Sequence, residues 1–293
     1  MAEHTLTLGT ENHLVATFTP ADTATSSAPP IVALLSNSGV IPRSGPHRMN
    51  VHLARRLAAQ GIPSVRFDMS GLGDSRRTGS TLPVVEQWVA DTRSVMDAAQ
   101  ARFGCARFMM IGFCSGAEVA HLVALEDPRL RAILFWDLYA YKTVQTRLRT
   151  FLYKLRRAGL TGAMRKAGER TLGLFRSPSA EGGNENGRAV EVSLVPPREV
   201  FAQRIQTLTD AGVESLFVFC GGEPEWFNHR GQFKGMFGRY AFVDKVAFHY
   251  LEVSDHLITS AAAQQAFLDM TEAWLKTRVL PATQVPPSLP LGR

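Results

Sequence analysis

The stretch Met109-Met110-Ile111-Gly112-Phe113-Cys114-Ser115-Gly116-Ala117-Glu118 decides the fold of this chain. An apolar run passes through a Gly-x-Cys-x-Gly core into a helix-forming sequence, which predicts a strand that turns sharply into a helix. Such a turn strains its central residue and crowds the residues two before and two after it, so both must be small. Gly112 and Gly116 meet this demand around Cys114, whereas a turn centred on Ser115 would crowd Phe113. The sequence therefore predicts a thiol nucleophile at Cys114.

Apolar strand patterns alternate with helical patterns on both sides of this stretch. Residues 5–18 alternate weakly and predict an antiparallel hairpin. Continuous apolar runs typical of buried strands follow at 31–35, 62–67, 108–111, 130–136, 216–220 and 246–253. Strands alternating with helices at this spacing predict an α/β fold with a doubly wound, mostly parallel sheet.

One insertion interrupts the alternation. Residues 138–212 contain basic amphipathic helices and a stretch rich in Gly, Asn, Ser and Glu, which together predict a helical lid. We therefore expect a core formed by residues 1–137 and 213–280. The Pro-rich residues 281–293 predict a disordered tail.

Charge and cysteine content narrow the function classes. The net charge is +6, and residues 142–176 hold ten Lys and Arg residues against Glu169 alone. No nucleic-acid motif accompanies this basic block. It fits either a solvated helix face or a surface for a carboxylate, a phosphate or an acidic acyl-carrier protein. No apolar run approaches the roughly 20 residues that span a bilayer.

Three cysteines without CxxC spacing indicate neither a disulfide framework nor a zinc site. The chain starts without the basic and apolar pattern of a signal peptide. We expect a cytoplasmic protein with reduced thiols, no metal and no cofactor.

Four motifs occur together: Ser38-Gly39 after the first parallel strand, Asp68-x-x-Gly71-x-Gly73-x-Ser75, the turn at Cys114, and Ser254-Asp255-His256 after the last strand. In this combination the chain resembles the α/β-hydrolase superfamily, in its lid-bearing branch of serine aminopeptidase-like hydrolases. The resemblance covers about 31–137 and 213–278, and it implies the α/β-hydrolase fold.

The resemblance also implies a base and an acid for Cys114. His256 follows an apolar strand, in the loop where the superfamily carries its catalytic histidine. The acid is expected after the strand at 216–220, where Glu223 is closer to the strand end than Glu225 and is favoured. Asp137 is a third option because some relatives use the preceding strand, although it also fits a helix cap.

The oxyanion hole implied by the resemblance consists of the backbone N–H groups of Val40 and Ser115. The sequence has Ser38-Gly39 where His-Gly is common, but backbone donors do not depend on that side chain.

These residues predict an enzyme that cleaves an ester, lactone or thioester of a small-molecule acyl substrate. The reaction would pass through an acyl group on Cys114, in a Cys-His-Glu triad. Two alternatives stay open. One is an acyltransferase or cyclase that passes the acyl group to an amine or hydroxyl, and the other is a non-catalytic hydrolase-like binding protein.

Overall fold

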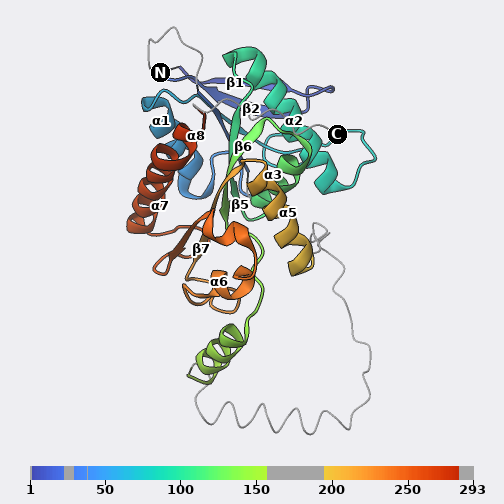
Figure 1. Cartoon of the computed structure of the whole chain (residues 1–293). Helices are drawn as coiled ribbons and strands as arrows, with labels where there is room; N and C mark the ends of the chain where they lie inside the picture. Colours follow the sequence, from blue (N-terminus) through green and yellow to red (C-terminus); the bar gives the residue numbers. More distant parts are fainter. Residues whose placement is uncertain (1, 23–29, 38, 157–194, 284–293) are drawn as a thin grey trace, which may run out of the picture.

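The computed structural model describes residues 2–22, 30–37, 39–156 and 195–283 (Figure 1). Ser38, most of the expected lid and the end of the expected tail lie outside these residues. None of the described helices is long and apolar enough to cross a membrane.

An eight-stranded sheet with the order β1-β2-β4-β3-β5-β6-β7-β8 forms the centre of the fold. Its strands are β1 (His4–Leu8), β2 (Leu14–Thr19), β3 (Val32–Ser36), β4 (Ser64–Phe67), β5 (Phe108–Phe113), β6 (Leu130–Trp136), β7 (Glu214–Cys220) and β8 (Ala247–Leu251). Strands β3 to β8 are parallel, while β1 and β2 form an antiparallel hairpin that pairs with β4. This is the α/β-hydrolase fold, as the sequence predicts.

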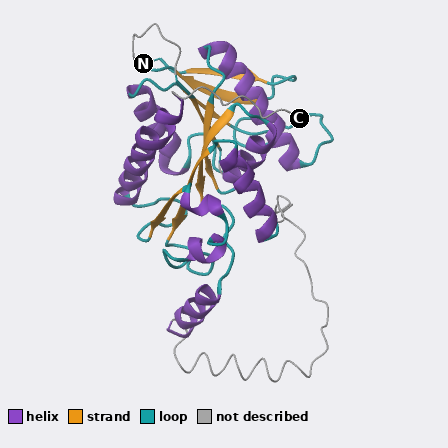
Figure 2. Cartoon of the chain, viewed as in Figure 1, coloured by secondary structure: helices purple, strands orange, loops and turns teal. Residues whose placement is uncertain are grey.

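Helices cover both faces of the sheet (Figure 2). They are α1 (Met49–Ala59), α2 (Val84–Phe103), α3 (Ser115–Glu126), α5 (Arg198–Asp210), α6 (Gln232–Phe237), α7 (Ala261–Trp274) and α8 (Leu280–Thr283), with 3₁₀ turns at Pro46–Arg48 and Ala241–Asp244 and a π-helical turn at Leu275–Val279. In Figure 1, α1, α7 and α8 lie on one side of the strands, and α2, α3 and α5 lie on the other.

Alternate residues of the central strands belong to two separate apolar clusters. On β5, Phe108 and Met110 pack towards α2 and α3, whereas Met109 and Ile111 pack towards α1 and α7. All four side chains are fully buried. A strand covered on both faces needs an unbroken apolar run, which is why these strands read as continuous hydrophobic segments.

The structure divides the segment expected to form the lid. Its last part is α5, a core helix whose Phe201 packs edge-on against Phe217 of the sheet. Residues 144–156 form a helix that lies apart from the sheet (Figure 1). Since 157–194 lie outside the described residues, the lid remains a prediction.

The end of the chain differs from the expectation in one respect. Residues 281–283, expected to be disordered, are helical as part of α8. The π-helical turn joins α7 to α8, and its Leu275 and Val279 are buried in the core. Apolar anchoring of this kind extends a helix beyond the point at which Pro-rich composition predicts its end.

Candidate active site

Cys114 occupies the turn between β5 and α3, at the carboxyl edge of the sheet. Its φ of 51° and ψ of −115° are a strained combination for a residue with a side chain. A Cβ added to Gly112 would lie 2.5 Å from the backbone of Ala117, and one added to Gly116 would lie 2.6 Å from Ser36 Oγ. The crowding expected around the turn is therefore present, and it leaves Cys114 exposed.

His256 lies in the loop between β8 and α7. Its backbone carbonyl accepts a hydrogen bond of 3.0 Å from the indole Nε1 of Trp136, at the end of β6. The same loop is anchored two residues later by Ile258, which is fully buried. These contacts hold the loop at the edge where β5 and β6 end.

Asp137 is the carboxylate that contacts His256. Its Oδ2 lies 2.7 Å from His256 Nδ1, and its Oδ1 accepts a hydrogen bond of 2.8 Å from the backbone N–H of Cys220. The side chains of His256 and Asp137 are 32% and 12% exposed, so the pair is largely shielded from water.

This contact favours Asp137, the third option, over the preferred Glu223. Within the described part of the chain, the exposed Glu223 side chain makes no hydrogen bond to His256, and Glu225 forms a salt bridge of 2.8 Å with Lys154. The chain turns at Gly221 and Gly222, where added Cβ atoms would clash with the loop that carries His256. The close approach of these two loops leaves the carboxylate at the end of β6, rather than that of Glu223, next to the imidazole.

The surroundings of His256 favour its protonated form. The hydrogen bond to Asp137, followed by those to Cys114 and Cys220, raises the pKa of His256 to about 12. Because Nδ1 is turned to Asp137, Nε2 is the ring nitrogen left for the thiol of Cys114. The imidazole thus lies between its carboxylate partner and the thiol of Cys114.

The loop after β3 lies beside the turn at Cys114. Gly39 donates its backbone N–H to Ser115 Oγ at 2.9 Å, and Asn37 Nδ2 donates to the carbonyl of Gly39 at 3.0 Å. Among the described residues, the backbone N–H groups of Val40 and Ser115 donate to no acceptor. The Ser115 side chain therefore holds the loop after β3, while its backbone N–H is free to donate to a ligand.

We expect Ser115→Ala to lower kcat about 10-fold with little change in KM. The hydroxyl holds the loop that carries Val40, and one such hydrogen bond contributes about 0.5–1.5 kcal/mol, or a factor of about 2 to 12. Steady-state kinetics with an activated ester measures both constants. Ser115→Thr, which keeps the hydroxyl, is the control, and an unchanged kcat in Ser115→Ala would contradict the role of this contact.

A buried ion pair supports the same loop and was not anticipated from the sequence. Arg43 donates its backbone N–H and its guanidinium to the two oxygens of Asp68, both at 2.6 Å. Asp68 is fully buried, and a Cβ on Gly73 would lie 2.4 Å from its carboxylate carbon. The buried carboxylate of Asp68 explains why the last position of the Asp-x-x-Gly-x-Gly motif must be glycine. No local sequence pattern predicts that Arg43, 25 residues away, is the partner of Asp68.

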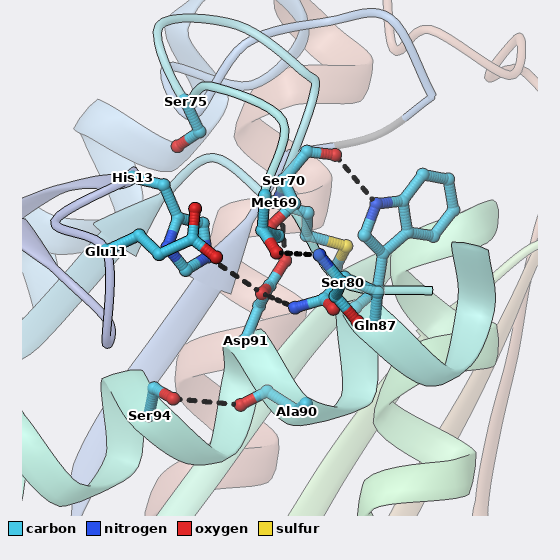
Figure 3. A network of polar contacts seen from close by, with 12 residues as sticks. Glu11, His13, Met69, Ser70, Ser75, Ser80, Gln87, Ala90, Asp91 and Ser94 are labelled. Carbon is cyan, nitrogen blue, oxygen red and sulfur yellow. Dashed lines mark hydrogen bonds and ion pairs between the residues drawn. The ribbon is translucent and has the colours of Figure 1, made fainter. Parts of the chain in front are cut away.

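A second histidine–carboxylate pair, His13 and Asp91, lies in a separate polar network (Figure 3). Asp91 accepts hydrogen bonds of 2.7 Å from the backbone N–H of Ser70 and from Gln87 Nε2, and it lies 3.4 Å from His13 Nε2. Both members of the pair are more than 95% buried, and neither is among the described residues that line the cavity at Cys114. This network fixes the loop after β4 to α2.

A cavity of about 410 Å³ opens over Cys114, Asp137 and His256. Its remaining lining residues are mostly apolar: Leu138, Tyr139, Ala140, Val195, Phe219, Glu223, Trp226 and Phe227. The volume is within the range of small-molecule sites. Glu223 also lines the cavity, so among the described lining residues one carboxylate is not bonded to His256.

Comparisons with known proteins agree with this architecture. Residues 46–154 match the family described as serine aminopeptidase, S33. No curated protein matches the sequence significantly.

Solved structures resemble the chain over nearly its whole length. Est1E from Butyrivibrio proteoclasticus is 12% identical and superposes with a TM-score of 0.58 over 95% of this chain and 99% of that one. The Pyrococcus furiosus esterase PF2001 is 12% identical with a TM-score of 0.58, over 95% and 90%. XC6422 from Xanthomonas campestris, described as an α/β serine hydrolase without a lid, is 13% identical with a TM-score of 0.55, over 94% and 93%.

At these identities the superpositions show the fold. The family match covers the segment from the 3₁₀ turn before α1 into the helix at 144–156. The chain is an α/β-hydrolase-fold protein whose residues 46–154 resemble the serine aminopeptidase S33 family.

Proposed function

We propose that the protein is an acyl hydrolase that cleaves an ester, lactone or thioester through a thioester intermediate on Cys114. The observation that carries the proposal is the meeting of a strained, exposed cysteine and the His256–Asp137 pair in one cavity. Nucleophile, base and orienting acid are the three parts that covalent acyl transfer requires.

In the first half of the reaction, the Cys114 sulfur attacks the substrate carbonyl carbon. The developing oxyanion accepts hydrogen bonds from the N–H groups of Val40 and Ser115. When the tetrahedral intermediate collapses, the leaving alcohol or thiol takes the proton from His256 Nε2. In the second half, His256 removes a proton from water, which attacks the thioester and releases the acid and the free thiol.

Intact-protein mass spectrometry after reaction with an activated acyl ester tests this proposal. We expect one acyl adduct, mapped to Cys114 by peptide analysis, and none in Cys114→Ala. Cys105→Ser is the matched control because Cys105 is buried and its thiol contacts the carbonyl of Arg107. An adduct that persists in Cys114→Ala would refute the assignment of the nucleophile.

The protonation of His256 gives a pH prediction. Because the pKa of His256 is raised above its ordinary value of 6.5, the imidazolium is expected to persist as the pH rises through 7 and 8. Asp137 is the largest cause, so Asp137→Asn removes the main raising interaction, and His256 should lose its proton at a lower pH. NMR titration of the imidazole signals measures this shift, and a wild-type midpoint near 6.5 would contradict it.

One observation favours a second function, in which the acyl group passes to an amine. Glu223 is an exposed carboxylate in the lining of the cavity and makes no side-chain hydrogen bond within the described residues. A carboxylate there suits an amine acceptor, which arrives as an ammonium ion. Product analysis with added amines separates the two functions. Amide formation that decreases in Glu223→Gln would support acyl transfer, whereas products of hydrolysis alone would exclude acyl transfer.

We also propose that an acidic acyl-carrier protein delivers the substrate. The helix at 144–156 carries Arg147, Arg149, Lys154 and Arg156 on exposed positions, and Lys142 lies 5.9 Å from the ring of Trp226 at the cavity. Electrostatic attraction between exposed charges weakens with salt. KM for a carrier-bound acyl thioester should therefore rise with ionic strength, and a KM insensitive to salt would contradict carrier docking.

A further inference from the structure

Cys220 is a second thiol beside the catalytic pair, and the proposed reaction does not use its sulfur. It is the last residue of β7 and is fully buried. Its backbone N–H donates to Asp137 Oδ1, and its thiol lies within hydrogen-bonding reach of both Asp137 and His256. The two residues of β7 nearest to Cys220 on this face, Leu216 and Val218, are apolar and fully buried. A small apolar side chain would fill this position equally well, so packing alone does not account for a thiol there.

A disulfide between Cys220 and Cys114 does not provide one. Cys114 follows β5, Cys220 ends β7, and β6 lies between the two strands. Two inter-strand spacings amount to about 9.6 Å. Cysteines whose Cα atoms are more than about 7 Å apart cannot be bridged without backbone movement.

The donor atoms around Cys220 instead match those of a metal site. One atom each from Asp137, Cys220 and His256 forms a group in which all atoms lie within 4.8 Å of one another. A carboxylate oxygen, a thiolate sulfur and an imidazole nitrogen are the ligands of Zn²⁺, which binds them at about 2.0 to 2.3 Å in a tetrahedral arrangement. Nδ1 of His256 and Oδ2 of Asp137, now 2.7 Å apart, would move apart to about 3.3 Å on either side of the ion, and water can supply the fourth ligand.

We propose that Asp137, Cys220 and His256 bind a thiophilic divalent ion such as Zn²⁺, and that this ion reversibly inactivates the site. The ion takes the place of the proton between His256 Nδ1 and Asp137. Two protons leave on binding, one from Nδ1 and one from the Cys220 sulfur, and no electrons are transferred. Three ligands, one at or after the end of each of β6, β7 and β8, then hold the ion.

The consequence for catalysis follows from the geometry of the imidazole ring. An ion at Nδ1 removes the hydrogen bond to Asp137 that orients the ring, and Nε2 then carries the single hydrogen of the neutral imidazole. Without a free lone pair at Nε2, His256 cannot take a proton from Cys114 or from water, and giving its hydrogen to a leaving group would leave an unfavourable imidazolate. Asp137 and His256 line the cavity, so an ion can reach them from solvent although Cys220 is buried.

Binding of Co²⁺, a spectroscopic substitute for Zn²⁺, tests the proposal on the full chain. We expect one Co²⁺ per chain, with a thiolate-to-cobalt charge-transfer band, in the wild type. Cys220→Ser should lose the band and bind more than about 10-fold more weakly, because the loss of even an outer-shell partner costs roughly 10- to 100-fold in affinity. Cys105→Ser, at a buried cysteine outside the group, should behave as the wild type does.

Cys114→Ala separates this proposal from the proposed function. This variant should keep the band although it forms no acyl-enzyme, because Cys114 is not a member of the donor group. A band that persists in Cys220→Ser, a band lost in Cys114→Ala, or no binding by the wild type would each overturn the assignment. If Cys220→Ser fails to fold, His256→Ala tests the same site at a side chain that is 32% exposed.

Discussion

Cys114→Ala is expected to lower kcat by about 10⁴-fold or more, the loss seen when an enzyme that forms an acyl intermediate loses its nucleophile. The remaining parts, an oriented histidine and the backbone donors, can assist water but cannot form the thioester. The rate of ester or thioester hydrolysis under saturating substrate measures the loss. Thermal unfolding should show a folded variant, because alanine introduces no new bulk at the turn.

The neighbouring hydroxyl provides the sharpest control. Ser115→Ala differs from Cys114→Ala by one position in the chain, yet it should lose only about 10-fold, through the contact to Gly39. Cys114→Ser tests whether the sulfur itself is needed, because a hydroxyl nucleophile depends more strongly on the base than a thiol does. A larger loss in Ser115→Ala than in Cys114→Ala would move the nucleophile to Ser115 and contradict our assignment.

Asp137→Asn is expected to have the second-largest effect, a loss in kcat of about 10²- to 10⁴-fold. The amide keeps the shape of the side chain but cannot stabilise the imidazolium, and its NH₂ group can favour the wrong tautomer of His256. A thiolate nucleophile needs less help from its base than a hydroxyl does, which is why the lower end of the range is included.

Glu223→Gln is the matched control for Asp137→Asn. Glu223 lies in the cavity lining but makes no contact with His256 among the described residues, so hydrolysis should change by less than about threefold. The two variants make the same chemical change on carboxylates of one cavity. If Glu223→Gln abolished hydrolysis and Asp137→Asn spared it, the acid would have to be reassigned to Glu223, after a movement of its loop.

The strand-turn-helix at Cys114 could be predicted because its constraints act within a few residues. The clash that excludes a side chain at Gly112 comes from Ala117, five positions later in the same turn. The alternation of buried strands and helices is likewise written into local hydrophobic patterns, and it predicted the mostly parallel sheet.

The partner of His256 could not be predicted in this way. Asp137 and Glu223 both follow a strand of the parallel sheet, so the sequence offered them as alternatives. The decision depends on how closely the loops at Gly221 and His256 approach, a distance set by packing between elements far apart in the chain. The anchoring of the His256 loop by Trp136, across 120 positions, is equally invisible to a local pattern.

The same reason limits what cysteine spacing can say about metals. Without a CxxC pair, the sequence indicated no zinc site, yet Asp137, Cys220 and His256 reach one place from the ends of β6, β7 and β8. By itself, the sequence determined the fold and the position of the thiol, because the steric constraints of the turn at Cys114 act between residues only a few positions apart. Only the tertiary structure decided which groups surround that thiol, because parallel strands bring distant loop ends to one edge of the sheet.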